Sequence, residues 1–428
     1  MRILFVSGEL IGSALCQRLV AEGNDVKLYI HGEDWKNCLD GIVPKTNHWG
    51  NELTWVTKDG LIIFDDVIFG EEQDWLRHFG YRVLGGNRKS DLLEVDRRHF
   101  QEIAKQYKIH TLPSFNFLSV QEAINFVENN QSRWVIKQNT HLSSLNFVGQ
   151  LEDGSDVLEV LRSYKKKNIS PIHLQEYAEG IEVGVARYFN GNDWVGPIEI
   201  NHEYKALEDG DAGPLTPEMG TVLWYTEEEV PLFAETLAKL KPYLQQIDFR
   251  GDIDINCIVN EKEIVPLEAT PRFGTPSTGL HVALHKSPWA DFLSAVANGE
   301  DYKLDFYKGF GIVVSIAVPP FPYAPDKFSM LSGSQKVLNI LLDKDLSKED
   351  LAHIHFEEVS KVDGGYQWAG NHGWVLHATA NAESIETAQK LVYERIDKIK
   401  IDGAFYRKDI GDRVYRNDIP KLKEWGWI

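Results

Sequence analysis

The sequence predicts a multidomain protein of mixed α/β and α+β class. Its 428 residues are too many for one compact core, so two to four domains are expected. Residues 2–30 alternate strand, helix and strand, which is the pattern of a parallel sheet with helices on its faces. Residues 251–268 instead carry two adjacent strand patterns joined by a short turn, which indicates an antiparallel pair.

The N-terminal β-α-β pattern continues into further strands of the same sheet. The buried run at residues 2–6 ends in Ser7-Gly8-Glu9, and strand patterns follow at 25–30, 61–64 and 81–84. Gly8 and Gly12 alone do not supply the G-x-G-x-x-G motif of dinucleotide-binding folds, so a dinucleotide site is not indicated.

The middle and the C-terminal part of the chain mix both element types. Helices are predicted near 92–107, 154–166, 230–247, 287–298 and 385–398. Strands are predicted near 134–137, 171–177, 181–189, 194–200, 311–318 and 374–379. The polar and aromatic stretch 301–308 is predicted to be a linker.

Residues 251–278 carry an unusual row of polar groups on a strand pattern. Asp252, Asp254 and Asn256 alternate with apolar residues, and the next strand pattern ends in Glu268 and Thr270. Adjacent strands would bring Asp254 and Glu268 to one place, where hard oxygen ligands suit Mg²⁺. The alternative is a solvated hairpin with ordinary surface carboxylates.

Residues 209–220 are predicted to form a loop, because two glycines and a proline fall within six residues. Such a loop can direct backbone N–H groups and a carboxylate towards a small ligand, or it can be a simple turn.

Composition limits the classes of partner. The net charge of −19 argues against nucleic acid as the main partner and means that a phosphate-bearing ligand needs a locally basic pocket. No apolar run approaches the roughly 18 residues of a membrane span, and the N-terminus does not resemble a signal peptide. The three widely spaced cysteines form neither a disulfide framework nor a metal motif, which fits a reducing cytoplasm.

Three motifs together resemble the glycinamide ribonucleotide synthetase family of the ATP-grasp superfamily. The family loop D-x-D-T-G-P-N-T-G-G-M-G corresponds to DGDAGPLTPEMG at 209–220. The family strand end E-F-N-x-R-F-G-D-P-E-T corresponds to EATPRFGTPST at 268–278, and R-K-D-I-G-x-R corresponds to 407–413. Their order and spacing agree over nearly the whole chain, so the sequence is identified as a divergent member.

The resemblance implies a three-part organisation. An N-terminal α/β domain is expected at 1–95, and a two-lobed ATP-grasp domain at 96–304, with its smaller lobe at about 110–178. An α+β C-terminal domain is expected at 305–428.

The resemblance also assigns roles in nucleotide binding and catalysis. The residues expected to bind ATP are Arg97, Lys137, Glu176 and Glu182. Lys205 and Arg272 are expected to be catalytic. Fixed cations of this kind stabilise charge on a transferring phosphoryl group.

Substrate and metal roles follow from the same motifs. Asp211 and Gly213 match the substrate loop, with Asp211 holding an ammonium and Arg272 a carboxylate of an amino acid. The expected metal ligands are Glu268, Thr270 where the family has Asn, and Asp254 as a substitute for the weaker hydroxyl. The alternative for Asp211 and Arg272 is that they pair with each other.

Two departures from the family pattern concern phosphate binding. The family's glycine-rich loop corresponds to residues 140–147, which contain neither glycine nor lysine. In the N-terminal domain, the phosphosugar motifs G-G-R-E-H-A and G-P-E-x-P-L are replaced by residues 8–12 and 65–70. The adjacent carboxylates of Asp65 and Asp66 would repel a ribose phosphate.

The implied activity is an ATP-dependent carboxylate–amine ligase that forms an amide through an acyl phosphate, with ADP and phosphate as products. ATP and Mg²⁺ or Mn²⁺ are the expected cofactors, and phosphoribosylamine–glycine ligation in purine biosynthesis is the family's default. Two alternatives stay open: ligation of an amino acid to a different amine, and a non-catalytic nucleotide-binding scaffold. The expected partners are small-molecule amino acid and amine substrates, without nucleic acid or membrane, for a cytoplasmic monomer or homodimer.

His281 and His285 form a further candidate pair, since their spacing places two imidazoles on one helical face. The pattern lacks the Glu of an H-E-x-x-H motif and a third ligand, so a structural role is the alternative.

Overall fold

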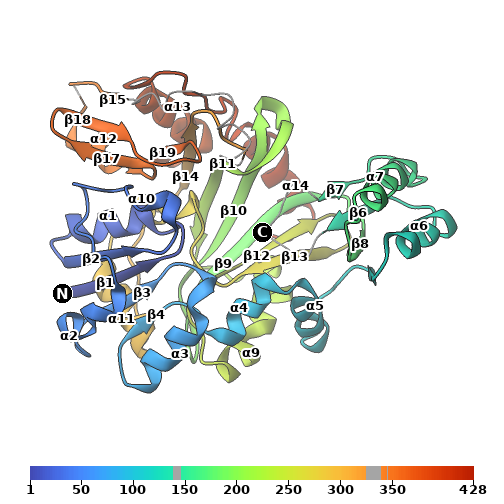
Figure 1. Ribbon diagram of the computed structural model, residues 1–428, viewed down its shortest axis with the longest axis horizontal. Helices are drawn as coiled ribbons and strands as arrows, with labels where there is room; N and C mark the ends of the chain where they lie inside the picture. The colour runs from blue at the N-terminus through green and yellow to red at the C-terminus, as the bar shows by residue number, and fades with distance from the viewer. Residues whose placement is uncertain (138–145, 324–338, 345) are drawn as a thin grey trace.

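The computed structural model describes residues 1–137, 146–323, 339–344 and 346–428 (Figure 1). It confirms the predicted fold class, with a parallel sheet at the N-terminus and antiparallel or mixed layers in the rest of the chain. None of the helices in the described ranges is long and apolar enough to cross a membrane.

The N-terminal part contains a four-stranded parallel sheet in the order β2-β1-β3-β4. Its strands are β1 (Arg2–Ser7), β2 (Asp25–Ile30), β3 (Leu61–Phe64) and β4 (Val83–Leu84). Its α-helices are α1 (Ser13–Ala21), α2 (Leu53–Val56) and α3 (Gly70–His78). β1 and β3 are buried on both faces, as their continuous apolar runs require.

An eight-stranded sheet forms the centre of the molecule, in the order β13-β12-β9-β10-β11-β14-β19-β16 (Figure 1). Its strands are β9 (Ile181–Asn190), β10 (Trp194–Glu208), β11 (Ala212–Thr226), β12 (Arg250–Val259), β13 (Ile264–Thr270), β14 (Phe310–Ala317), β16 (Ile354–Phe356) and β19 (Trp374–Ala382). β14 pairs with β11, so this sheet continues across the domain boundary predicted at 304–305. The division into domains therefore stays a prediction.

A small lobe projects to one side of the central sheet (Figure 1). Its strands are β5 (Ser114–Phe117), β6 (Trp134–Lys137), β7 (Phe147–Val148) and β8 (Ile172–Glu176), and its helices are α6 (Val120–Asn129) and α7 (Ser155–Lys166). Ser119 begins α6 with a capping box in which Glu122 returns a side-chain contact to its backbone. The lobe has its own hydrophobic core, centred on Trp134 and Ile136.

The C-terminal part adds a second small sheet and returns to the central one. This sheet has the order β17-β18-β15-β20, formed by β15 (Asn339–Leu342), β17 (Val359–Val362), β18 (Gly365–Trp368) and β20 (Ile399–Ile401). Its α-helices are α12 (Lys348–Ala352), α13 (Ile385–Ile396) and α14 (Ile419–Glu424). After α14, the Trp427 indole N–H donates to the Asn260 carbonyl, 2.8 Å away, and ties the chain end to the central sheet.

Two predicted helices are interrupted. The helix expected over 92–107 is divided into α4 (Arg88–Val95) and α5 (Arg97–Gln106), because Asp96 leaves helical geometry and caps α5 through the amides of Arg98 and His99. The helix expected over 230–247 is divided as well. Its pieces are α8 (Pro231–Glu235), a 3-10 turn (Leu237–Leu240) and α9 (Lys241–Gln246).

The prediction of a loop over 209–220 was wrong for most of its length. Only residues 209–211 form the turn, and β11 begins at Ala212. Between the pairs Tyr204–Gly220 and Ala206–Leu215, four residues of β11 lie opposite Lys205 alone. Such a large bulge tolerates Pro217, which has no backbone N–H to donate, inside a strand.

The remaining α-helices are α10 (Ser277–Leu284) and α11 (Trp289–Asn298). Both are largely buried and pack between the N-terminal sheet and the central sheet. These contacts hold the β12–β13 pair close to the N-terminal part, which positions the site described next.

Candidate functional site

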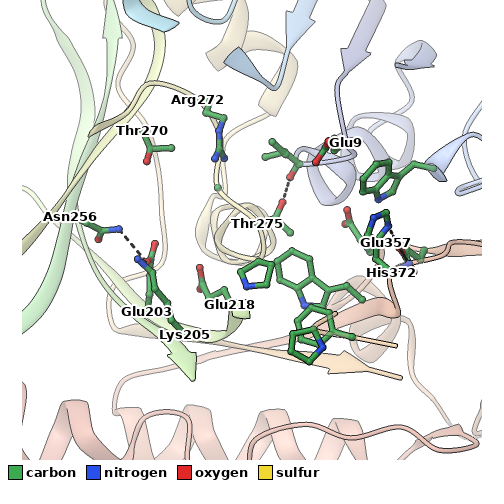
Figure 2. A pocket seen from close by; sticks show the side chains of 18 of the residues that line it. Glu9, Glu203, Lys205, Glu218, Asn256, Thr270, Arg272, Thr275, Glu357 and His372 are labelled. Carbon is green, nitrogen blue, oxygen red and sulfur yellow. Dashed lines mark hydrogen bonds and ion pairs between the residues drawn. The ribbon is translucent and has the colours of Figure 1, made fainter. Parts of the chain in front are cut away.

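A cavity of about 740 Å³ lies where the central sheet meets the N-terminal and C-terminal parts. Figure 2 shows Glu203, Lys205 and Asn256 on one side and Glu357 and His372 on the other, with Glu218 between them. The first side is formed by β10, β12 and β13, and the second by loops of the outer parts. Segments far apart in the sequence therefore share one cavity.

Lys205 is the centre of a group of charges on the first side. It follows Asn201 and Glu203 on β10 at a spacing of two, so the three side chains share one face of the sheet. Its ammonium lies 2.9 Å from Glu203, 3.1 Å from Glu182 and 3.6 Å from Glu268. Burial alone would lower the pKa of Lys205, but these carboxylates raise it well above its usual range, so the residue stays charged.

Glu268 receives charge from several cations. It lies opposite Asn256 in the β12–β13 register, and its carboxylate is 3.5 Å from Arg97. The positive charge of Lys205, opposed by burial and supported by Arg97 and Lys137, lowers the pKa of Glu268 to about 2. Glu268 is therefore ionised at any physiological pH.

Lys137 is the last residue of β6, at the edge of the small lobe that faces this group. Burial, followed by the charge of Arg97, lowers the pKa of Lys137 to about 8, and Glu268 and Glu182 partly oppose the shift. We use the name ion-pair cluster for the set that these interactions join: Arg97, Lys137, Glu182, Glu203, Lys205 and Glu268. The structure thus brings together most of the charged residues that the sequence predicted for the site.

The expected metal ligands are not equivalent in this geometry. Asp254 lies opposite Thr270, accepts a hydrogen bond of 2.8 Å from the Asn201 amide, and does not line the cavity. Burial and the charge of Glu203 raise the pKa of Asp254 well above its usual range, and its role as a metal ligand stays a prediction.

Glu268 and the cavity-lining Thr270 and Asn256 offer one ionised and two neutral oxygen donors. In the described part of the chain, no group of three or more His, Cys, Asp or Glu side chains is arranged to hold a metal on its own. This donor set fits Mg²⁺, which takes one or two protein carboxylates and fills its shell with substrate phosphates and water. Asn256 is a candidate that sequence reasoning did not select.

Arg272 is held rigidly at the rim of the cavity. Its Nε and Nη2 donate to both oxygens of Glu94 at 2.7–3.1 Å, and Nη1 donates to the Phe273 carbonyl. Burial alone would lower its pKa, yet Glu94 and Asp66 raise it beyond the usual range, so the guanidinium stays charged.

Asp211 is not in the cavity, and it does not meet Arg272. It accepts hydrogen bonds from Arg407 at 2.9 Å and from Arg413 at 2.7 Å, the two arginines of the C-terminal motif. Gly213 does not line the cavity either. Asp211 and Arg272 therefore do not form the direct ion pair that was the alternative. A substrate role for Asp211 and Gly213 stays a prediction.

Glu176 ends β8, opposite Trp134 in the register, while Lys137 lies opposite His173 at the other end of the pair. Glu176 and Lys137 are therefore separated along the lobe. The counterpart of the family's glycine-rich loop, predicted over 140–147, lies outside the described residues up to Leu145.

The second side of the cavity was largely missed by sequence reasoning. We call it the interdomain side, and its members are Glu9, Ile11, Trp35, Phe321, Tyr323, Glu357, Glu358, His372 and Trp374. The ring of Trp35 stacks on His372 at 4.3 Å. These residues come from five separate stretches, so no local spacing could have grouped them.

His281 and His285 do not form a metal pair. His281 lies 2.7 Å from Glu199, whose charge outweighs burial and raises the pKa of the imidazole to about 9. His285 stacks on Trp289 at 4.0 Å. The structural alternative therefore describes them better.

Comparison with known proteins places the chain in a family. The family models of the phosphoribosylglycinamide synthetase ATP-grasp (A) domain and C domain match residues 95–278 and 313–413. A phosphoribosylamine–glycine ligase of Clostridium acetobutylicum is 26% identical over 347 residues, which cover 78% of this chain and 79% of that protein.

Solved structures share the fold. The phosphoribosylamine–glycine ligase of Thermotoga maritima superimposes with a TM-score of 0.68 at 21% identity, covering 96% of this chain and 100% of that one. A biotin carboxylase of Campylobacter jejuni gives 0.65 at 10% identity, covering 98% and 96%. The two family models together span more than half of the sequence, and the ATP-grasp match includes every residue of the ion-pair cluster. The chain therefore belongs to the phosphoribosylglycinamide synthetase family of the ATP-grasp superfamily.

Proposed function

We propose that this chain is an ATP-dependent ligase that joins the carboxylate of an amino acid to an amine. The Clostridium acetobutylicum relative and the Thermotoga maritima structure named above are phosphoribosylamine–glycine ligases, and this activity class is transferred from them. The observation that carries the proposal is the ion-pair cluster, in which cations of three segments meet carboxylates at one wall of a large cavity.

The cluster supplies what phosphoryl transfer requires. Lys137, Arg97 and Lys205 would contact the phosphates of ATP, because fixed cations stabilise the charge on the transferring group. Glu268, with Asn256 or Thr270, would hold a divalent cation, which neutralises phosphate charge when it is bound. Arg272, fixed by Glu94, would hold the carboxylate group of the amino acid.

The reaction has two steps with balanced bonds. A carboxylate oxygen attacks the γ-phosphorus of ATP, a new O–P bond forms, and ADP leaves. The amine nitrogen then attacks the acyl carbon, the C–O bond to phosphate breaks, and the nitrogen loses a proton. The products are the amide, ADP and phosphate.

Trapping of the acyl phosphate tests the proposal. The protein is incubated with Mg²⁺, ATP and each common amino acid, and hydroxylamine converts any acyl phosphate into a hydroxamate. Hydroxamate and ADP formed in equal amounts with at least one small amino acid is the expected result. ATP binding without hydroxamate from any amino acid would contradict ligase activity and favour a nucleotide-binding scaffold.

A further inference from the structure

The amino end of α1 carries two carboxylates of this chain. In parallel α/β sheets, the turn after the first strand directs backbone N–H groups at a bound phosphate. Here the N–H groups of Gly8 and Gly12 donate to Asp65 at 3.2 and 2.7 Å, and the Ser7 hydroxyl donates to Asp65 at 2.7 Å. Ser13, the first residue of α1, donates its hydroxyl to Glu357. These donors are therefore already used.

The carboxyl groups at the amino end of α1 also disfavour the binding of an anion there. Asp65 is fully buried, and burial together with Asp66 raises its pKa to about 7. Burial likewise raises the pKa of Glu357, which lies on the interdomain side of the cavity. A phosphate dianion could bind at this position only if both carboxyl groups moved away or took up a proton.

Glu218 is a buried acidic group that lines the cavity. It is 5% exposed, and its buried Oε1 has no hydrogen-bond partner in the described part of the chain. Burial, followed by the charge of Glu203, raises the pKa of Glu218 well above its usual range, so the group holds a proton until a nearby cation favours its ionised form. Figure 2 shows its carboxylate directed into the cavity, between Lys205 and the interdomain side. The four-residue bulge of β11 opposite Lys205 produces this position. The corresponding family motif, T-G-G-M-G, has glycine where this chain has Glu218.

Aromatic rings line the same cavity as Glu218. Trp35, Phe321, Tyr323 and Trp374 line the same cavity, and ring faces attract cations. The described cations that line it are already engaged, Lys205 with Glu203 and Arg272 with Glu94. A buried carboxyl group with an unpartnered oxygen, in a cavity that aromatic rings also line, is a site that a cationic group would satisfy.

We propose that the acceptor substrate is an amine that carries a second, positively charged group and no phosphate, with Glu218 as the residue that contacts this group. The reacting amino group must be neutral when it attacks, so the charge that Glu218 contacts belongs to another nitrogen of the same molecule. This inference rests on the proposed ligase function and specifies its acceptor.

The experiment compares acceptors once an amino acid that gives hydroxamate has been found. The probes are 1,4-diaminobutane, 1-butylamine, O-phosphoethanolamine and phosphoribosylamine generated in place, and the amide is measured by mass spectrometry. We expect kcat/KM for 1,4-diaminobutane to exceed that for either phosphorylated amine at least ~10-fold, the size of one charge-assisted contact. A phosphorylated amine that is used as well as or better than the diamine would overturn the proposal.

Variants of Glu218 make the test specific. Glu218→Gln keeps the volume but cannot ionise when a cation binds, so the preference for 1,4-diaminobutane over 1-butylamine should fall ~10-fold or more. Glu228→Gln, at an exposed position just beyond β11, is the matched control and should keep the parent preference. Thermal melting verifies that both variants fold. A folded Glu218→Gln protein with the parent preference would also overturn the proposal.

The two proposals fail in different ways. If the proposed ligase function is wrong, no hydroxamate forms with any amino acid. Failure of the acceptor inference shows as hydroxamate formation together with the wrong order of amines.

Discussion

The two sides of the cavity stabilise their carboxylates in different ways. In the ion-pair cluster, Glu182, Glu203 and Glu268 face lysine and arginine, which keep Glu268 ionised. On the interdomain side, Glu358 accepts from the Trp368 indole N–H and from the amide N–H of Gly373, which are neutral donors, and the His372 ring lies 3.3 Å away as its one titratable partner among the described residues. Ion pairs near solvent can exchange partners with a charged ligand, whereas neutral donors leave the carboxylate's charge in the site. The charges of the first side therefore fit the phosphate binding proposed above, and those of the second fit the acceptor proposed above.

The largest expected effect concerns Glu268. Glu268→Gln removes the ionised ligand of the proposed metal site, so turnover should fall at least ~100-fold, since metal neutralisation contributes several kcal/mol to the barrier. ADP release measures the effect. Glu261→Gln, exposed in the turn of the same β12–β13 hairpin, is the control and should turn over like the parent. Near-parent turnover in Glu268→Gln would contradict a metal site on this side of the cavity.

The next effect concerns Lys137. Lys137→Ala removes a cation of the ion-pair cluster, and ATP should bind roughly 10- to 100-fold more weakly, the range of one hydrogen bond to a charged group. Isothermal calorimetry with the folded variant measures the affinity. Unchanged ATP binding would show that the small lobe does not contribute this residue to the nucleotide.

The pH dependence of ATP binding sharpens the role of Lys137. Its pKa of about 8 in the free protein means that the ammonium loses its proton as the pH rises through this value. ATP affinity should therefore be full below pH 7 and fall about fivefold between pH 8 and 9. Lys137→Arg should flatten this fall, because a guanidinium stays protonated. An equally steep fall in Lys137→Arg would assign the titration to another group.

A smaller effect is expected at Arg272. Arg272→Lys keeps the charge but cannot present two parallel N–H groups to Glu94, so the side chain loses its fixed direction. The KM for the amino acid should rise about 10-fold while ATP affinity changes little. Steady-state kinetics with varied amino acid separates the two. An unchanged KM would mean that the amino acid carboxylate binds elsewhere.

The smallest effect on activity is expected at Asp211. Asp211→Asn weakens the contacts with Arg407 and Arg413, and since Asp211 is 40% exposed the loss of stability should be only about 1 kcal/mol. Chemical denaturation measures this loss. A large rise in the KM for the amino acid, without a loss of stability, would instead restore the substrate role predicted from sequence.

Local sequence predicted Glu268, whose chemistry depends on one strand and its neighbour. The polar end of β13 indicated this residue, because strand periods and strand ends are readable from a few residues. Lys205 on β10 and Lys137 at the end of β6 were predicted from the resemblance to the family. The reasoning from strand periods chose Asp254 over Asn256. The bulge between Asn256 and Cys257 decides the register there, and a bulge is not visible in the alternation.

The sequence by itself determined the fold class, the family and the charged residues of the ion-pair cluster other than Glu203, since these depend on patterning and short motifs. Only the tertiary structure decided which partners those charges meet: Arg272 meets Glu94 and Asp211 meets Arg407, across separations of 178 and 196 residues. It also placed Asp65 at α1 and Glu218 in the cavity. Contacts between distant segments follow from the packing of whole layers, and packing is set by the sum of many apolar contacts that no local pattern records.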